Sequence, residues 1–148
     1  MKKWIGMLAV LMVASAAFAT EGWLTDFEQA KAQAKAENKY VLVDFSGSDW
    51  CGWCIKLEHE VFSKAAFKAY ARENLVLMLA DFPSGKPQTA AVKAQNRRMA
   101  EQFGIRGYPT VIVLGPDGAL VGRTGYQRGG PEAYVEHVKG LIKAYESK

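Results

Sequence analysis

Both cysteines of this 148-residue chain lie in one short segment, Cys51-Gly52-Trp53-Cys54. The segment before them, residues 40–45, is a nearly continuous apolar run, which predicts a strand buried on both faces. After them, apolar residues recur along one face of a predicted helix from about residue 52 to 73. The cysteine pair therefore stands at a strand-to-helix junction. This junction restricts the chain to a layered fold in which a helix packs on a sheet.

The rest of the chain continues the alternation of helices and strands. Residues 115–118, Gly-Pro-Asp-Gly, predict a tight turn that joins two antiparallel strands. Residues 81–88 contain proline and glycine and predict a loop. The order predicts one α/β domain with crossovers between the early strands and a hairpin near the end. Further helices are predicted from Thr25 or Asp26 to 38, over 89–103 and over 131–145, and further strands over 75–80, 109–114 and 119–124.

The first 19 residues have the pattern of a signal peptide. Lys2 and Lys3 precede an apolar stretch, and the segment ends in Ala17-Phe18-Ala19, a small-x-small cleavage site. The alternative is an uncleaved membrane anchor, but the apolar run is short for a spanning helix. We therefore expect a signal peptide at 1–19, a single domain at 20–148, a periplasmic or otherwise secreted protein, and no stable membrane insertion after cleavage.

Charge excludes a nucleic-acid partner. Cleavage after residue 19 removes two lysines and no acids, so the formal net charge falls from +4 to +2. That value is too low for a nucleic-acid-binding surface, and no basic run is interleaved with aromatic residues.

The spacing of the two cysteines favours redox exchange over stabilisation. Cysteines of exported proteins are normally paired, yet a bridge across three residues closes a very small loop and contributes little chain entropy. At the start of the predicted helix, Cys51 meets free backbone N–H groups that favour a thiolate, which is the attacking species in disulfide exchange. Cys54 lies one helical turn inward. We therefore expect Cys51 to attack the substrate disulfide and Cys54 to resolve the mixed disulfide.

Two other uses of a cysteine pair are disfavoured. A haem attachment site requires histidine directly after the second cysteine, and that position is Ile55. A structural zinc site requires about four ligands, and the only histidines, His59 and His137, do not have a usual spacing. On the predicted helix, His59 is expected to face the surface. The sequence therefore predicts no metal and no cofactor.

Two segments carry a family resemblance. Val43-Asp44-Phe45 followed by residues 50–54, and Phe103 to Thr110 with its Gly-Tyr-Pro-Thr end, resemble the two signatures of the thioredoxin superfamily. The closing hairpin and last helix are similar too, and the run around the cysteines resembles exported bacterial thioredoxin-like proteins. The resemblance implies a thioredoxin-like α/β fold, a central mixed sheet flanked by helices on both faces.

The resemblance also implies roles for individual residues. Pro109 matches the family's cis-proline, which leaves the backbone of Tyr108 free to pair with an extended substrate. A trans proline at a strand start is the alternative. Asp44 matches the buried acid that moves the proton of Cys54. It lies seven residues before Cys51, where thioredoxin has six, so a strand-edge aspartate without a role is the alternative. Asp49, a second nearby acid, is expected to be a turn or cap residue.

The residues next to the cysteines indicate how a substrate binds and in which direction electrons flow. Trp50, Gly52 and Trp53 are candidate substrate-binding residues: the indoles offer an apolar platform, although they can equally be packing residues. Trp53 replaces the usual proline or histidine. Since Gly52 and Trp53 carry no charge, the pattern favours a reductase or mild isomerase of exported proteins, supplied with electrons by a membrane-bound thiol relay. The alternatives are a disulfide-donating oxidase and a non-enzymatic module that binds a peptide or partner.

Overall fold

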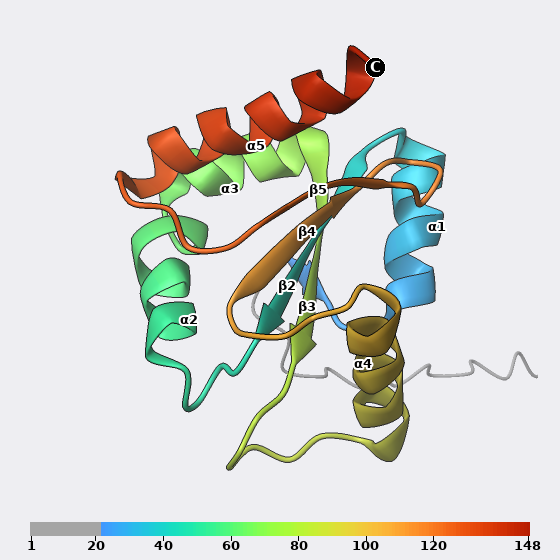
Figure 1. Cartoon of the computed structure of the whole chain (residues 1–148), viewed down its shortest axis with the longest axis vertical. Helices are drawn as coiled ribbons and strands as arrows, with labels where there is room; N and C mark the ends of the chain where they lie inside the picture. The colour runs from blue at the N-terminus through green and yellow to red at the C-terminus, as the bar shows by residue number, and fades with distance from the viewer. Residues whose placement is uncertain (1–21) are drawn as a thin grey trace, which may run out of the picture.

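The computed structural model describes residues 22–148, so the expected signal peptide lies outside the described residues. Over the described residues the chain forms five strands, five α-helices and one π-helical segment, η1, which follows the second α-helix (Figure 1). In chain order the elements are β1 (Trp23–Leu24), α1 (Phe27–Glu37), β2 (Tyr40–Ser46), α2 (Gly52–Leu57), η1 (Glu58–Phe62), α3 (Ala65–Asn74), β3 (Leu75–Asp81), α4 (Ala90–Gln102), β4 (Thr110–Leu114), β5 (Leu120–Thr124) and α5 (Gly130–Glu146).

The strands form one sheet in the order β1-β3-β2-β4-β5. β3 pairs in parallel with both β1 and β2, whereas β4 pairs antiparallel with β2 and β5. The parallel pair β2–β3 needs a crossover, and the chain supplies it through α2 and α3. The predicted mixed sheet, its crossover and its closing hairpin are therefore confirmed.

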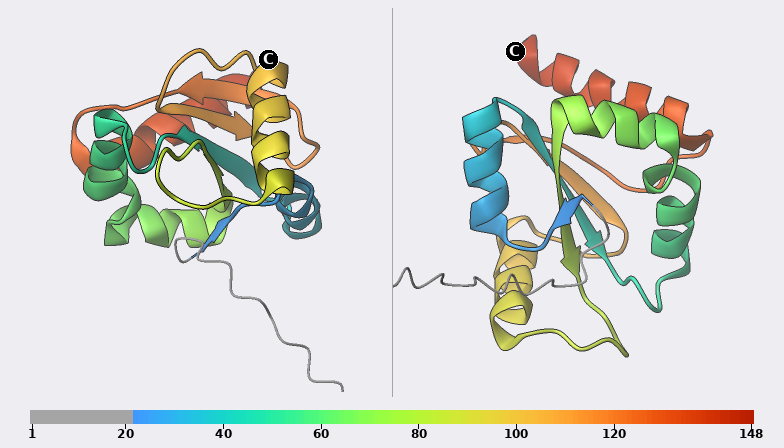
Figure 2. Two further views of the ribbon diagram at one scale, coloured as in Figure 1. Left: turned by 90° about the horizontal axis from the view of Figure 1, so that it is seen from below. Right: turned by 180° about the vertical axis from the view of Figure 1, so that it is seen from behind.

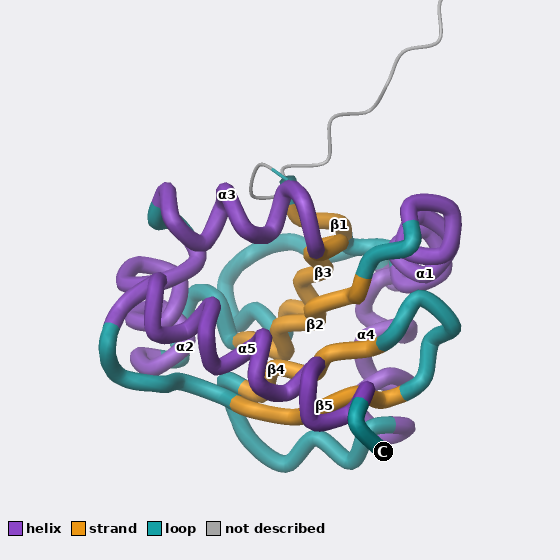
Figure 3. The backbone as a smooth tube through the Cα atoms, turned by 90° about the horizontal axis from the view of Figure 1, so that it is seen from above, coloured by secondary structure: helices purple, strands orange, loops and turns teal. Residues whose placement is uncertain are grey.

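Helices cover both faces of the sheet, as expected. α2, α3 and α5 lie on one face, and α1 and α4 lie on the other (Figures 1–3). Successive side chains of β2 point to opposite faces, so Leu42 packs in the core under α2, α3 and α5, and Val41 and Val43 pack under α1 and α4. Burial on both faces explains why this strand reads as a continuous apolar run.

The sequence predicted one continuous helix over 52–73, and this prediction is wrong. The segment consists of α2, the π-helical segment η1, and, after Ser63 and Lys64, α3. The Ser63 N–H donates to the Glu58 carbonyl five residues back, and Lys64 has an extended backbone. This bend lets Phe62 and Phe67, with ring centroids 4.9 Å apart, enter the same core. The apolar repeat continues through the break, so periodicity alone did not reveal it.

The sequence also did not predict β1. Trp23 pairs with Leu77 of β3, and its ring centroid lies 5.1 Å from that of Phe62. Asp26 begins α1 by accepting a hydrogen bond from the Gln29 N–H at 2.8 Å. A strand of two residues is too short for a period-two pattern, so only its tertiary contacts identify it. Within residues 22–148, no helix combines the length and apolar character needed to span a bilayer.

Candidate active site

The two cysteines form a disulfide at the start of α2, with Cα atoms 5.2 Å apart. Cys51 is the N-cap of the helix, and its Sγ accepts a hydrogen bond from the Cys54 N–H at 3.2 Å. Cys51 is 7% exposed and Cys54 is 2% exposed. When the bond is reduced, the same N–H points at a Cys51 thiolate, which lowers the cost of forming the nucleophile. The strand-to-helix junction predicted for the pair is confirmed.

The turn between β2 and the disulfide is closed by backbone hydrogen bonds. The Cys51 N–H donates to the Gly47 carbonyl at 2.8 Å. The indole of Trp50 lies so close over Gly47 that a Cβ there would stand 2.4 Å from the ring. The indole N–H then donates to the Phe82 carbonyl at 2.8 Å. A side chain at position 47 would therefore displace the Trp50 ring.

Asp44 lies on β2, two residues after Leu42, and therefore faces the sheet side that α2, α3 and α5 cover. It is 5% exposed, and its Oδ1 is buried without a hydrogen-bond partner among the described residues. Burial raises the pKa of Asp44 to about 8, with further increases from the charges of Glu58 and Asp81. A carboxyl group with this pKa exchanges protons near neutral pH.

Asp49 has a different function, although it is only two residues from Cys51. Its carboxylate accepts backbone hydrogen bonds from Ser84 at 2.8 Å and Gly85 at 2.6 Å. These bonds hold the pKa of Asp49 below its usual range. The expectation of a turn or cap residue is thus sharpened: Asp49 fixes the loop after β3 against the turn that precedes the disulfide.

The Tyr108–Pro109 peptide bond is cis, as the family resemblance implies. The Tyr108 ring lies between two other aromatic rings: its centroid is 5.8 Å from that of Trp50 and 5.2 Å from that of Phe82. Trp50 remains 52% exposed. These three residues form an aromatic rim on one side of the disulfide, which we call the Trp50 rim. Sequence reasoning missed Phe82, because nothing in a predicted loop indicated that it meets the site.

A second group surrounds Trp53, which is also 52% exposed. Its ring lies 5.1 Å from that of Tyr126, and the Lys56 ammonium sits over both rings at 5.1 and 5.5 Å. Glu60 accepts a hydrogen bond from the Tyr126 hydroxyl and pairs with Lys56 at 3.8 Å. Lys56 and Glu60 are four residues apart and lie on the same helical face. The contact with Tyr126, which follows β5, was missed because no local pattern links the two segments.

The histidines stand apart from the cysteine pair. His59 is exposed on η1, as expected. His137 on α5 shares a hydrogen bond with the Thr124 hydroxyl at 2.8 Å. Over residues 22–148, no three His, Cys, Asp or Glu side chains are grouped so that they could hold a metal ion.

Comparison with known proteins agrees with this geometry. Residues 27–139 match the family model of the thioredoxin-like domain. The disulfide bond reductase DsbH of Chlamydia pneumoniae is 31% identical over 117 residues, which cover 79% of this chain and 70% of that protein. A solved structure of a DsbH oxidoreductase superposes with a TM-score of 0.79 and 28% identity, covering 93% of this chain and 95% of the other.

A second relative from Chlamydia pneumoniae, the thioredoxin-related protein DsbJ, is 29% identical over 70% of this chain but only 30% of its own length. The oxidised C-terminal domain of DsbD from Neisseria meningitidis shares the fold, with a TM-score of 0.55 and 19% identity over 77% of this chain and 90% of that domain. The chain belongs to the thioredoxin-like domain family. With its cysteine pair joined at the start of α2, it is a thiol-disulfide oxidoreductase.

Proposed function

We propose that this protein reduces or isomerises disulfides of exported proteins. The observation that carries the proposal is the Cys51–Cys54 disulfide at the N-terminus of α2, on the sheet face where Asp44 is buried. The direction is supported by the name of its relative DsbH, a disulfide bond reductase, and by the absence of a charged residue at positions 52 and 53.

In the reaction, the Cys51 thiolate attacks one sulfur of the substrate disulfide and forms a mixed disulfide, releasing the first substrate thiolate. Asp44 then accepts the proton of the Cys54 thiol, and the resulting Cys54 thiolate attacks Cys51. A bond forms between Cys51 and Cys54, and the second substrate thiolate leaves with both electrons. Placement of Cys51 at the helix N-cap and burial of Asp44 support these two assignments.

The substrate lies across the Trp50 rim. The backbone next to cis Pro109 is offered to an extended segment, like an added strand, and the exposed indoles of Trp50 and Trp53 contact its apolar side chains. Gly52 lies between the cysteines and is exposed, so a substrate backbone can approach the disulfide closely. The partners are therefore protein or peptide disulfides.

Export completes the proposal. The chain is made with a signal peptide at 1–19 and acts outside the cytoplasm as the single domain 20–148, and a membrane-bound thiol relay returns it to the dithiol. The relatives named as Dsb proteins support this setting. In a cell fraction released by osmotic shock, the protein is expected to begin at Thr20. Recovery of the uncleaved chain in the membrane fraction would contradict the expectation.

The test of function uses residues 20–148 and a model protein disulfide, with dithiothreitol as electron donor. We expect the wild type to catalyse reduction, Cys51→Ser to abolish it, and Cys54→Ser to accumulate a mixed disulfide with the substrate that survives on a non-reducing gel. Unchanged turnover by Cys51→Ser would refute the enzyme mechanism.

The alternative function is a disulfide-donating oxidase, because the same pair can run in the opposite direction. Equilibration of the Cys51–Cys54 pair with glutathione separates the two. A potential near ~ −270 mV supports the reductase, and one near ~ −120 mV supports the oxidase. A binding module without enzymatic activity is the outcome if neither direction shows turnover.

A further inference from the structure

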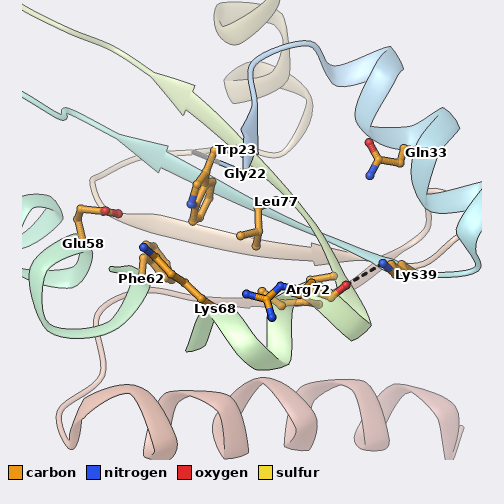
Figure 4. Close-up of a pocket in the computed structure, with 11 residues that line it drawn as sticks. Gly22, Trp23, Gln33, Lys39, Glu58, Phe62, Lys68, Arg72 and Leu77 are labelled. Atoms are coloured by element: carbon orange, nitrogen blue, oxygen red, sulfur yellow. Dashed lines mark hydrogen bonds between the residues drawn. The ribbon is translucent and has the colours of Figure 1, made fainter. Parts of the chain in front are cut away.

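A cavity of about 560 Å³ lies on the sheet face covered by α3, between that helix and β1 (Figure 4). Its apolar wall contains the rings of Trp23 and Phe62. Its polar wall contains three cations, Lys39, Lys68 and Arg72, together with one acid, Glu58. The lining shares no residue with the Trp50 rim, so a substrate bound at that rim leaves the cavity open.

Glu58 is placed to connect this cavity with the disulfide side of the same helix. It lies one helical turn after Cys54, and its N–H donates to the Cys54 carbonyl, so both side chains are on the inward face. The π-helical segment begins at Glu58. Figure 4 shows its side chain projecting toward the indole of Trp23 at the cavity wall. Segments of π-helix inside helices are rare and often occur at functional sites.

The charge of Glu58 also reaches Asp44. After burial itself, Glu58 is the largest cause of the raised pKa of Asp44. Glu58 is half-buried, and that burial raises its own pKa while the charge of Lys68 lowers it. Asp81 of β3 and Tyr134 of α5 interact electrostatically with Asp44, and Lys68 of α3 interacts with Glu58. Lys39 and Arg72 are the other charged residues that line the cavity.

We infer that Glu58 is the proton relay between the buried Asp44 and solvent in the cavity behind the active-site helix. The inference rests on the proposed function of the Cys51–Cys54 pair. In this arrangement the substrate binds at the Trp50 rim, and protons enter and leave through the cavity. Glu58 acts through Asp44, so it is a positioning residue that does not contact the reacting sulfur atoms.

The proton balance follows from the exchange reaction. When a thiolate attacks Cys51 of the disulfide, the bond to Cys54 breaks and the Cys54 thiolate takes the proton of Asp44. The Asp44 carboxylate is then reprotonated by Glu58, which takes a proton from water in the cavity. When Cys54 resolves a mixed disulfide, the proton travels the other way. Electrons pass only between sulfur atoms, and Glu58 ends each cycle in its starting state.

The test measures reduction of the Cys51–Cys54 disulfide by dithiothreitol in residues 20–148, followed by the fluorescence of the adjacent tryptophans from pH 5 to 9. For Glu58→Gln we expect a rate at pH 7 about tenfold below wild type, less than the ~10²-fold that general acid–base catalysis contributes. The matched control is Glu73→Gln, which removes an exposed acid of α3 outside the cavity. It is expected to follow the wild-type pH profile.

Chemical rescue separates a relay from a merely structural role. In Glu58→Ala, the missing carboxylate leaves a space at the cavity wall near Lys68, which a small carboxylate such as formate can enter. We expect formate to accelerate reduction of the Glu58→Ala disulfide in proportion to its concentration, and to leave the wild-type rate unchanged. A variant that only disturbed packing would not respond to formate.

The relay is refuted if Glu58→Gln retains the wild-type pH profile, or if formate does not accelerate Glu58→Ala. Dithiothreitol attacks the disulfide without any protein substrate. Failure to reduce protein disulfides would therefore overturn the proposed function and leave this result intact. Conversely, a protein that reduces protein disulfides but fails these two tests keeps its function and loses the relay.

Discussion

Asp44 and Asp49 are the two acids between the start of β2 and the disulfide, and their surroundings are opposite. Asp49 is nearer in sequence, but its carboxylate is occupied by the N–H groups of Ser84 and Gly85. Asp44 is farther away and buried, and its Oδ1 has no hydrogen-bond partner within residues 22–148. Hydrogen bonds lower the pKa of Asp49, whereas burial raises the pKa of Asp44.

The difference shows that distance along the chain does not determine whether the pKa of an acid near the disulfide is raised or lowered. The turn over residues 47–50 rotates Asp49 toward the loop after β3, while β2 keeps Asp44 on the face that α2 covers. An acid whose charge is fully solvated or hydrogen-bonded holds its proton weakly and serves as an anchor. An acid that is buried without a partner has a pKa near the working pH and serves in proton transfer.

The largest expected effect is kinetic and belongs to Asp44. We expect Asp44→Asn to slow the resolution of a mixed disulfide at pH 7 by about 10²-fold, because an amide cannot accept the Cys54 proton. The rate is measured by rapid mixing of the reduced enzyme with a protein disulfide and quenching in acid. The deficit should shrink above pH 9, where a thiol loses its proton to solvent unaided. An Asp44→Asn rate equal to wild type at pH 7 would show that Asp44 does not accept the Cys54 proton.

The second effect concerns stability. Because the pKa of Asp44 is raised in the folded state, its stabilising contribution is complete below its unfolded value of 3.8 and is lost as the pH rises to about 8. Relative to Asp44→Asn, the wild type should lose at least about 2 kcal/mol of unfolding free energy between pH 5 and pH 9. Urea unfolding of the oxidised proteins at the two pH values measures this difference. If the wild type and Asp44→Asn lost the same unfolding free energy between pH 5 and pH 9, folding would not raise the pKa of Asp44.

Much of the fold was predictable because its elements have strong local patterns. The continuous apolar run of β2 predicted burial on both faces, and the turn at 115–118 predicted the hairpin of β4 and β5. The π-helical segment and the two-residue strand β1 were not predictable. Their geometry is set by the packing of Phe62 against Phe67 across the helix break and against Trp23, which is far away along the chain.

The residues of the candidate site also divide into those that the sequence indicated and those that it did not. The disulfide between the cysteines and the cis peptide bond before Pro109 agree with the sequence patterns in which these residues stand, and the role of Asp44 stays a prediction. Phe82, Tyr126 and Glu58 were missed because each reaches the site through contacts that no local pattern encodes. Only Glu58 had a sequence signal, its position one helical turn after Cys54, and that spacing alone does not distinguish it from an exposed helix residue.

The third prediction concerns Asp49, whose carboxylate holds the loop after β3. In Asp49→Ala, the amides of Ser84 and Gly85 lose their acceptor, and their hydrogen exchange should accelerate about tenfold or more through easier local opening. Amide exchange by NMR measures this, with Val111 in the buried strand β4 as an internal control that stays unchanged. The same variant should keep resolution at pH 7 within about twofold of wild type, because the hydrogen-bonded Asp49 carboxylate, with its lowered pKa, is a poor proton acceptor. A kinetic deficit as large as that of Asp44→Asn would give Asp49 a role in proton transfer.

The smallest expected effect is the coupling between the two acids. If Asp44 transfers protons and Asp49 only holds a loop, the rate deficit of the double variant should equal the product of the single deficits within about twofold. The measurement is the resolution rate at pH 7 for the wild type, both single variants and the double variant. Phe82 lies in the loop that Asp49 holds, and its ring packs against that of Tyr108 in the Trp50 rim. If a change in this loop affects the reaction at the disulfide, the double variant will show it. A double variant no slower than Asp44→Asn alone, when Asp49→Ala is itself slow, would mean that the loop acts through the proton-transfer step. Multiplicative deficits would keep anchoring and proton transfer separate.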